Sequence, residues 1–242
     1  MAMKEQTINT AAPADLKLKL KTKEWIIILT LGLTLLSFIE SLRSFPWSPF
    51  ILVYVMVLFV VPLYLKTYRF GQFKKAWPIK PILIGLIGIK VWQTAYQFVY
   101  DYFLESYGVL GNPNYDLFKA TNALLNQTAE KYNSVIVAAV LMGFTILIIP
   151  FAEELYYRGY VFGTLRENSG FWSAALISSS LLAVRHFAHL LFIQPFPVIP
   201  ASIWVLSTIP IGIGLAYIYD QTKSLYAVIL IHFLLNVPIL PR

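Results

Sequence analysis

A long apolar segment at residues 50–65 reads FILVYVMVLFVVPLYL. Its sixteen residues carry no charge, and as an α-helix they would extend roughly 24 Å at about 1.5 Å per residue. With its flanking residues included, such a segment is long enough to cross the ~30 Å hydrocarbon core of a bilayer. The segment therefore predicts a transmembrane helix.

Six other segments have the same character. The first runs from Trp25 to Ile39, and a later one follows Pro81 and contains Lys90. Besides the segment that begins at Trp25, the other five are at 82–103, from about 134 into the 160s, at 171–193, at 200–219 and at 224–240. Because every backbone polar group must be paired inside a bilayer, apolar segments of this length are helical. The sequence predicts an all-α, polytopic transmembrane helical bundle of about seven spans.

The composition supports a membrane protein. Hydrophobic residues make up 58% of the 242, charged residues 13%, and the mean hydropathy is +0.66. A soluble domain has about a quarter charged residues, so this chain has too few to solvate its whole surface. There are no cysteines, which excludes disulfides, thiolate metal sites and a cysteine nucleophile.

The net charge of +7 does not indicate nucleic-acid binding, because of where the positive residues lie. Ten of the nineteen Lys and Arg residues precede the first apolar segment or separate the second from the third: Lys4, Lys17, Lys19, Lys21, Lys23, Lys66, Arg69, Lys74, Lys75 and Lys80. Basic loops of this kind face the cytoplasm. The N-terminus is therefore expected in the cytoplasm. We interpret the membrane that the chain spans as a prokaryotic cytoplasmic membrane.

The chain divides into three parts. Residues 1–22 are polar and are expected to form a disordered cytoplasmic tail. Residues 23–132 contain the first spans and a loop at 104–132. This loop has two lysines and three acidic residues, so it is expected on the outer side of the membrane. Residues 133–242 hold the remaining spans and most of the polar groups that interrupt apolar segments.

The first of these polar groups is at residues 151–158, which contain two adjacent carboxylates and an arginine. Glu154 and Arg158 are spaced i, i+4 and can pair on one helix face, whereas Glu153 points about 100° away. Glu153 is therefore expected to be desolvated and without that partner, as suits a general base. In the alternative interpretation the cluster only marks the cytoplasmic end of the helix.

The three histidines of the chain lie in two later spans. His186 and His189 follow a run of serines at 178–180, while His232 is spaced i, i+4 from Asn236 in the last span. If the turns near 166–171 and 220–224 lie at one membrane face, Glu153, His186, His232 and Asn236 lie roughly 18, 22, 12 and 18 Å above it. The groups can therefore converge on one cavity inside the membrane.

These residues resemble the motifs of the CPBP family, which groups type II CAAX prenyl endopeptidases with bacteriocin-processing and immunity (Abi) proteins. The family motifs are Glu-Glu-x-x-x-Arg, Phe-x-x-x-His and His-x-x-x-Asn on successive spans. The first and third match at Glu153 to Arg158 and at His232 to Asn236. The middle motif differs from the family pattern, because neither histidine has a phenylalanine four residues before it. That position is Leu182 for His186 and Arg185 for His189. His186 is favoured, and His189 stays a secondary candidate.

The resemblance covers about residues 133–240 and implies a four-helix catalytic core that cleaves peptide bonds in the membrane. Glu153 would activate a water that His186 also binds, while His232 and Asn236 would bind the oxyanion. Glu154 would orient the site through Arg158. Family members are described both as metalloproteases and as metal-free glutamate-dependent proteases. Glu153, His186 and His232 could hold Zn²⁺, but we favour a site without metal.

The implied partners are membrane lipids and a membrane-associated or lipid-anchored protein or peptide substrate. There is no His-Glu-x-x-His and no Gly-x-Ser-x-Gly, which excludes zincin-like and serine-elbow hydrolases. Two other interpretations stay open: an inactive membrane adaptor or immunity protein on the same scaffold, and a proton-coupled transporter. A transporter would more often show paired repeats, and the sequence shows none.

Overall fold

The computed structural model describes residues 25–26, 28–30, 32–33, 49–65, 78–108, 130, 136, 140, 143, 147–189 and 198–236. Every regular element in these ranges is a helix, as the all-α prediction expects. The predicted tail, the basic loop at 66–77 and most of the outer loop lie outside the described residues. The division of the chain at residues 22 and 132 stays a prediction.

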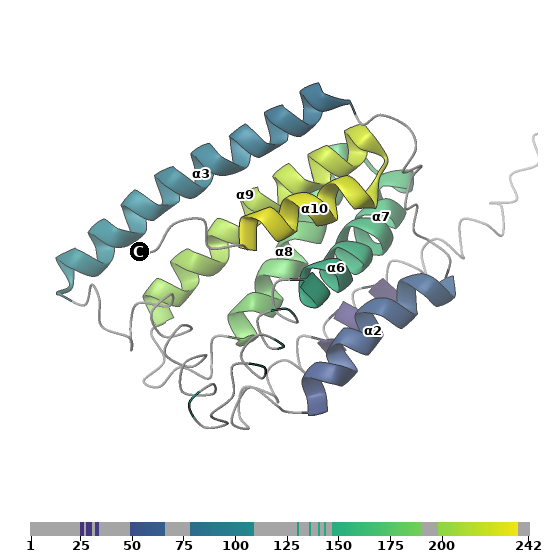
Figure 1. Cartoon of the computed structure of the whole chain (residues 1–242), viewed down its shortest axis with the longest axis horizontal. Coiled ribbons are helices and arrows are strands. Elements are labelled where there is room, and N and C mark those ends of the chain that lie inside the picture. Colours follow the sequence, from purple (N-terminus) through teal and green to yellow (C-terminus); the bar gives the residue numbers. More distant parts are fainter. Residues whose placement is uncertain are drawn as a thin grey trace, which may run out of the picture.

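Five helices coincide with predicted apolar segments to within a few residues over the described ranges (Figure 1). They are α2 (Pro49–Leu65), α3 (Ile79–Ser106), α8 (Phe171–His189), α9 (Val198–Thr222) and α10 (Leu225–Asn236). Two of the described helices, Ile79–Ser106 and Ala201–Thr222, are long and apolar enough to cross a membrane. The count of seven spans is not tested by these residues and stays a prediction.

The long helix expected from about 134 into the 160s is described from residue 147 and contains three consecutive parts. They are α6 (Ile149–Glu153), η2 (Glu154–Phe162) and α7 (Gly163–Asn168). The residues at the junctions keep right-handed helical dihedrals, so the helix is continuous. Its middle part is a nine-residue π-helix, and the expectation of regular α-helix there was wrong. π-Helical segments are rare and are frequently found at functional sites.

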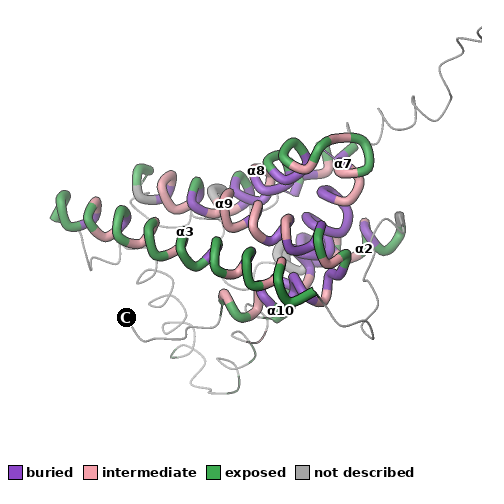
Figure 2. Tube along the Cα trace, turned by 90° about the horizontal axis from the view of Figure 1, so that it is seen from above, coloured by how far each residue is buried: buried purple, intermediate pink, exposed green. Residues whose placement is uncertain are grey.

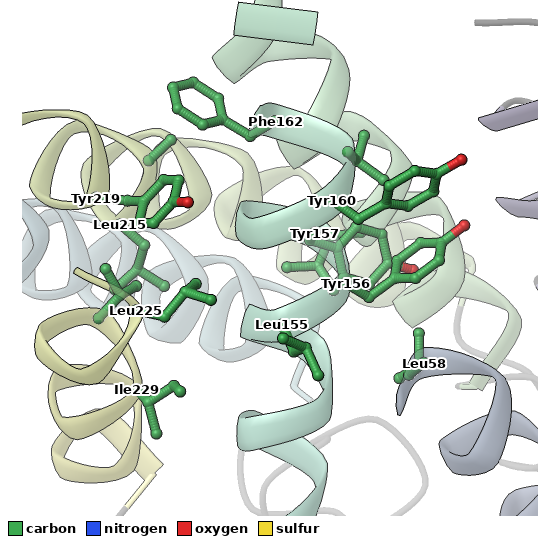
Figure 3. Close-up of a cluster of buried hydrophobic side chains, with 14 of the residues drawn as sticks. Leu58, Leu155, Tyr156, Tyr157, Tyr160, Phe162, Leu215, Tyr219, Leu225 and Ile229 are labelled. Carbon is green, nitrogen blue, oxygen red and sulfur yellow. The ribbon is translucent and has the colours of Figure 1, made fainter. Parts of the chain in front are cut away.

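The π-helical part η2 is at the centre of the bundle. It contacts α2, α8, α9 and α10, and all nine of its residues are buried. Figure 3 shows its aromatic residues Tyr156, Tyr157 and Tyr160 packed together, with Leu58 of α2 nearby. Of the two acidic residues of the first motif, Glu153 directly precedes this buried segment and Glu154 is its first residue.

The helix α3 lies along the outside of the bundle and packs against α9 (Figures 1 and 2). The two helices approach closely because each has a glycine opposite an isoleucine of the other. A Cβ atom at Gly85 would overlap the side chain of Ile218, and one at Gly214 would lie 2.6 Å from Cγ1 of Ile89. Small residues at such contacts let transmembrane helices pack at short range.

The outer face of α3 is apolar and exposed. Its large exposed side chains include Leu83, Ile84, Ile87, Val91, Phe98 and Val99. Apolar surface of this extent on a soluble protein normally marks a contact with a partner or a membrane. A lipid-facing helix at the edge of a membrane bundle accounts for this surface.

We expect Gly85→Val to destabilise the bundle, because the added methyl groups meet Ile218 in a packed contact. Overpacking of this kind costs about 1–3 kcal/mol. Gly88→Val is the matched control, since a Cβ atom at Gly88 meets nothing within 4 Å and both changes are made on the same helix. Thermal unfolding in detergent measures the difference, and equal shifts for the two variants would show that α3 is not held by this contact.

Candidate active site

Glu153 is the last residue of α6, directly before the π-helical segment. Its side chain is 3% exposed, and its Oε1 lies 3.0 Å from Nη1 of Arg185 on α8. The guanidinium carbon of Arg185 lies 4.6 Å from the ring centroid of Tyr54 on α2. Spacing within the helix gave Glu153 no partner, because Arg158 faces Glu154, yet Glu153 has an ion-pair partner in Arg185. The partner comes from another helix, which spacing within one helix does not reveal.

Glu154 is fully buried and makes two contacts with one of its oxygens. Its Oε1 lies 3.1 Å from Nη1 of Arg158, so the predicted i, i+4 ion pair is present. The same oxygen accepts a hydrogen bond of 2.6 Å from Nδ1 of His232 on α10. An ionised carboxylate only accepts hydrogen bonds, so Nδ1 of His232 carries a proton. Glu154 therefore connects the first motif directly to the last span.

Arg158 extends this network to α9. Its Nη2 donates a hydrogen bond of 3.4 Å to the carbonyl oxygen of Gly212. A Cβ atom at Gly212 would lie 2.6 Å from Oγ of Ser179 and 3.2 Å from Nη2 of Arg158. Glycine at this position therefore lets the α9 backbone come close enough to accept from a buried guanidinium.

His186 on α8 is held on two sides. Its Nδ1 makes a hydrogen bond of 2.9 Å with the carbonyl oxygen of Leu182. Its ring is tilted against Trp204 of α9, with centroids 5.6 Å apart. A carbonyl oxygen can only accept, so Nδ1 carries the proton and, in the neutral ring, Nε2 keeps its lone pair. His186 can therefore accept a hydrogen bond through Nε2.

The predicted polar groups lie close together. Glu153 is within electrostatic range of His186, His232 and Arg158 as well as of its partner Arg185. Two carboxylates and two guanidiniums balance in charge, and all four of these side chains are buried. A buried charge is tolerated when it is paired. The three polar regions of the sequence thus form one charge-balanced cluster.

Two predicted site residues lie at the ends of helices. Asn236 is the last residue of α10 and is exposed, one turn beyond His232. His189 is the last residue of α8, and its side chain lies outside the described set. His186 lies within electrostatic range of Glu153, and the choice between the two histidine candidates stays a prediction.

Among the described residues the cluster is arranged as an ion-pair network, and the contacts of its two histidines use Nδ1 and leave Nε2 for a further partner. Glu153 faces a guanidinium, and both His186 and His232 use Nδ1 for other contacts. Over the described ranges, no three or more His, Asp or Glu side chains are grouped to hold a metal ion. The ligand set of Glu153, His186 and His232 and the preference for a site without metal both stay predictions.

Three residues around the cluster were missed as site candidates: Arg185, Tyr54 and Gly212. Arg185 had a signal, because an arginine inside an apolar span is expensive and is normally paired or functional. Tyr54 and Gly212 are common residue types in apolar helices, and nothing in their spacing links them to the motifs. Only the packing of α2 and α9 against η2 makes them part of the site.

Comparison with known proteins agrees with the motifs. Residues 134–238 match the family model of type II CAAX prenyl endopeptidase Rce1-like proteins. YdiL of Bacillus subtilis, described as a proposed membrane peptidase, is 28% identical over 136 residues, 55% of this chain and 49% of its own length. CAAX prenyl protease 2 of Methanococcus maripaludis is 29% identical over 102 residues, 38% of this chain and 37% of its own length. No solved structure matches significantly.

The chain thus spans about half the length of the first of these relatives and less of the second. The matched region contains every predicted site residue from Glu153 to Asn236, while α2 and α3 precede it. The predicted resemblance is confirmed: residues 134–238 match the type II CAAX prenyl endopeptidase, Rce1-like family model, and two peptidases of this kind are similar to the chain.

Proposed function

We propose that this chain is an intramembrane endopeptidase that hydrolyses peptide bonds of membrane-associated or lipid-anchored protein substrates. The observation that carries the proposal is that Glu153, His186 and His232, from three helices, lie within electrostatic range of one another around buried side chains of opposite charge. The similarity of residues 134–238 to CAAX prenyl endopeptidases supports the reaction type. The membrane bundle gives the site access to substrates that lie at or in the bilayer.

In this proposal Glu153 is the general base. Its carboxylate takes a proton from a water molecule, and the resulting hydroxide attacks the carbonyl carbon of the scissile peptide bond. His186 accepts a hydrogen bond from the same water through Nε2, since its Nδ1 donates to Leu182. The proton held on Glu153 then passes to the nitrogen of the leaving amine when the C–N bond breaks.

His232 and Asn236 are proposed to stabilise the oxyanion, because hydrolysis needs donors where negative charge develops. Nδ1 of His232 already donates to Glu154, so Nε2 donates as well only when the ring is protonated. The adjacent carboxylate of Glu154 stabilises that protonated ring, as a carboxylate does in other hydrolases. Glu154 thus acts on His232 directly in addition to its ion pair with Arg158.

An inactive adaptor and a proton-coupled transporter are distinguished from a protease by the products. Termini of membrane proteins are compared by mass spectrometry between cells that express the wild-type chain and cells that express Glu153→Ala. A protease produces termini that are lost in the variant, whereas an adaptor or transporter leaves the set of termini unchanged.

We expect Glu153→Gln to abolish cleavage while the protein still inserts and accumulates, because an amide cannot take the proton from water. Loss of a general base typically lowers the rate by about 10²–10⁴-fold. The control is Glu105→Gln, at an exposed position near the end of α3, which should cleave normally. Cleavage of a substrate from the terminus comparison is the measurement, and activity above a tenth of wild type would mean that Glu153 is not the base.

We expect Arg158→Ala to lower both thermal stability and activity, because it leaves Glu154 buried without its ion-pair partner. Removing one member of a buried pair costs about 3–5 kcal/mol. Arg166→Ala is the control, since Arg166 is 40% exposed and its partner Asp220 keeps a second ion pair, with Lys223 at 2.6 Å. Lost activity with an unchanged melting curve in detergent would point instead to a direct contact between Arg158 and substrate.

The two histidine candidates and the metal question are tested with one set of preparations. His186→Ala should abolish cleavage, because His186 lies beside Glu153, and His189→Ala should keep roughly a tenth or more. A site that uses Glu153-activated water should be unaffected by chelator. Activity that is lost on chelation and restored by Zn²⁺ would overturn the metal-free proposal, and an inactive His189→Ala would reassign the middle motif.

A further inference from the structure

Arg185 is the charge partner of Glu153, and it connects the proposed base to a helix outside the region of family similarity. The side chains of both residues are buried, and their ion-pair distance is 3.0 Å. On its other side the guanidinium lies over the ring of Tyr54, which is 1% exposed. A carboxylate of α6, a guanidinium of α8 and an aromatic ring of α2 therefore form one buried unit.

Arg185 compensates the negative charge of Glu153, but the carboxylate keeps an oxygen that can accept a further hydrogen bond. Oε1 of Glu153 lies within ion-pair distance of Nη1, yet it makes no aligned hydrogen bond within the described part of the chain. An arginine in this position favours an ionised carboxylate in an apolar interior, while the oxygen can still accept a hydrogen bond. A base needs both properties, since it must be ionised and able to accept a proton.

Tyr54 supports this arrangement from α2. The face of its ring attracts a cation, and the attraction is strongest when both groups are removed from water. Both Tyr54 and Arg185 are buried, so this contact is removed from water. The position of Arg185 therefore depends on α2 as well as on α8.

We propose that Arg185 and Tyr54 are positioning residues that hold Glu153 ionised and oriented for proton transfer, so that α2 is part of the catalytic machinery. The functional half of this inference rests on the proposed endopeptidase activity. Its physical half concerns the charge of Glu153 and is measured without any substrate.

Infrared spectroscopy of the purified full-length protein in detergent tests the charge of Glu153. The difference between wild type and Glu153→Gln should contain the bands of an ionised carboxylate. The same difference in an Arg185→Leu background should contain the band of a protonated acid, and in an Arg185→Lys background the ionised bands should return. An ionised Glu153 in the Arg185→Leu background would overturn the inference whatever the enzyme cleaves.

Kinetics on a cleaved substrate test the role of the ring. Tyr54→Phe keeps the ring and should stay within about threefold of wild type, whereas Tyr54→Leu should lower kcat about ten- to thirtyfold with little change in KM, as expected for loss of a desolvated cation–π contact. Tyr64→Leu is the control, because Tyr64 is on the same helix and is 82% exposed. Melting curves of all variants separate misfolding from lost positioning.

The outcomes separate this inference from the proposed function. Full activity of Tyr54→Leu and Arg185→Leu beside an inactive Glu153→Gln would overturn the positioning role and leave the endopeptidase proposal intact. Full activity of Glu153→Gln would overturn the endopeptidase mechanism. The infrared experiment would still decide, independently of activity, whether Arg185 keeps Glu153 ionised. If Arg185→Leu does not fold, Arg185→Lys and the Tyr54 pair still decide the outcome.

Discussion

The carboxylate of Glu154 is the constraint on which the rest of the site depends. It is fully buried, and an ionised group in an apolar interior is tolerated only when it is paired and hydrogen-bonded. Arg158 supplies the charge from the same helix, and His232 supplies a hydrogen bond from α10. Arg158 in turn needs the carbonyl oxygen of Gly212 on α9. One buried charge thus sets the relative positions of three helices, and with them the direction of the His232 ring.

The contacts within one helix could be predicted from the sequence, and the contacts between helices could not. Glu154 and Arg158 are four residues apart, and this spacing alone predicts their ion pair. The pairs Glu153–Arg185 and Glu154–His232 join residues whose rotation about different helix axes is unknown until the bundle is packed. The sequence therefore placed the polar groups at a common depth but assigned Glu153 no basic partner. The apolar helices themselves were predictable, since long apolar segments in a bilayer must pair their own backbone groups and are therefore helical.

The π-helical segment is a second feature without a sequence signal. Its residues include glutamate, leucine and arginine, which all suit an ordinary α-helix, so the wider winding is determined by packing rather than by propensity. The segment is buried along its whole length, and Oγ of Ser178 on α8 donates a hydrogen bond of 2.7 Å to the carbonyl oxygen of Tyr157. A neighbouring helix thus satisfies part of the altered backbone. Glu153 lies where the two kinds of helix meet, so the direction of its side chain depends on that junction.

A site for hydrolysis inside an apolar bundle must be neutral overall and must still have groups that bind water. The charges of the two carboxylates and two guanidiniums cancel, and the proposed positive charge on His232 is matched by the oxyanion that forms during hydrolysis. The second requirement is met by carboxylate oxygens that accept no hydrogen bond from the protein although the charge of their group is compensated. Among the described residues, Oε1 of Glu153 and Oε2 of Glu154 are buried oxygens of this kind. Buried polar atoms of this kind are the usual partners of internal water. Stability of the ion pairs and the binding of water therefore depend on different features of the same carboxylates, as the proposed endopeptidase activity requires.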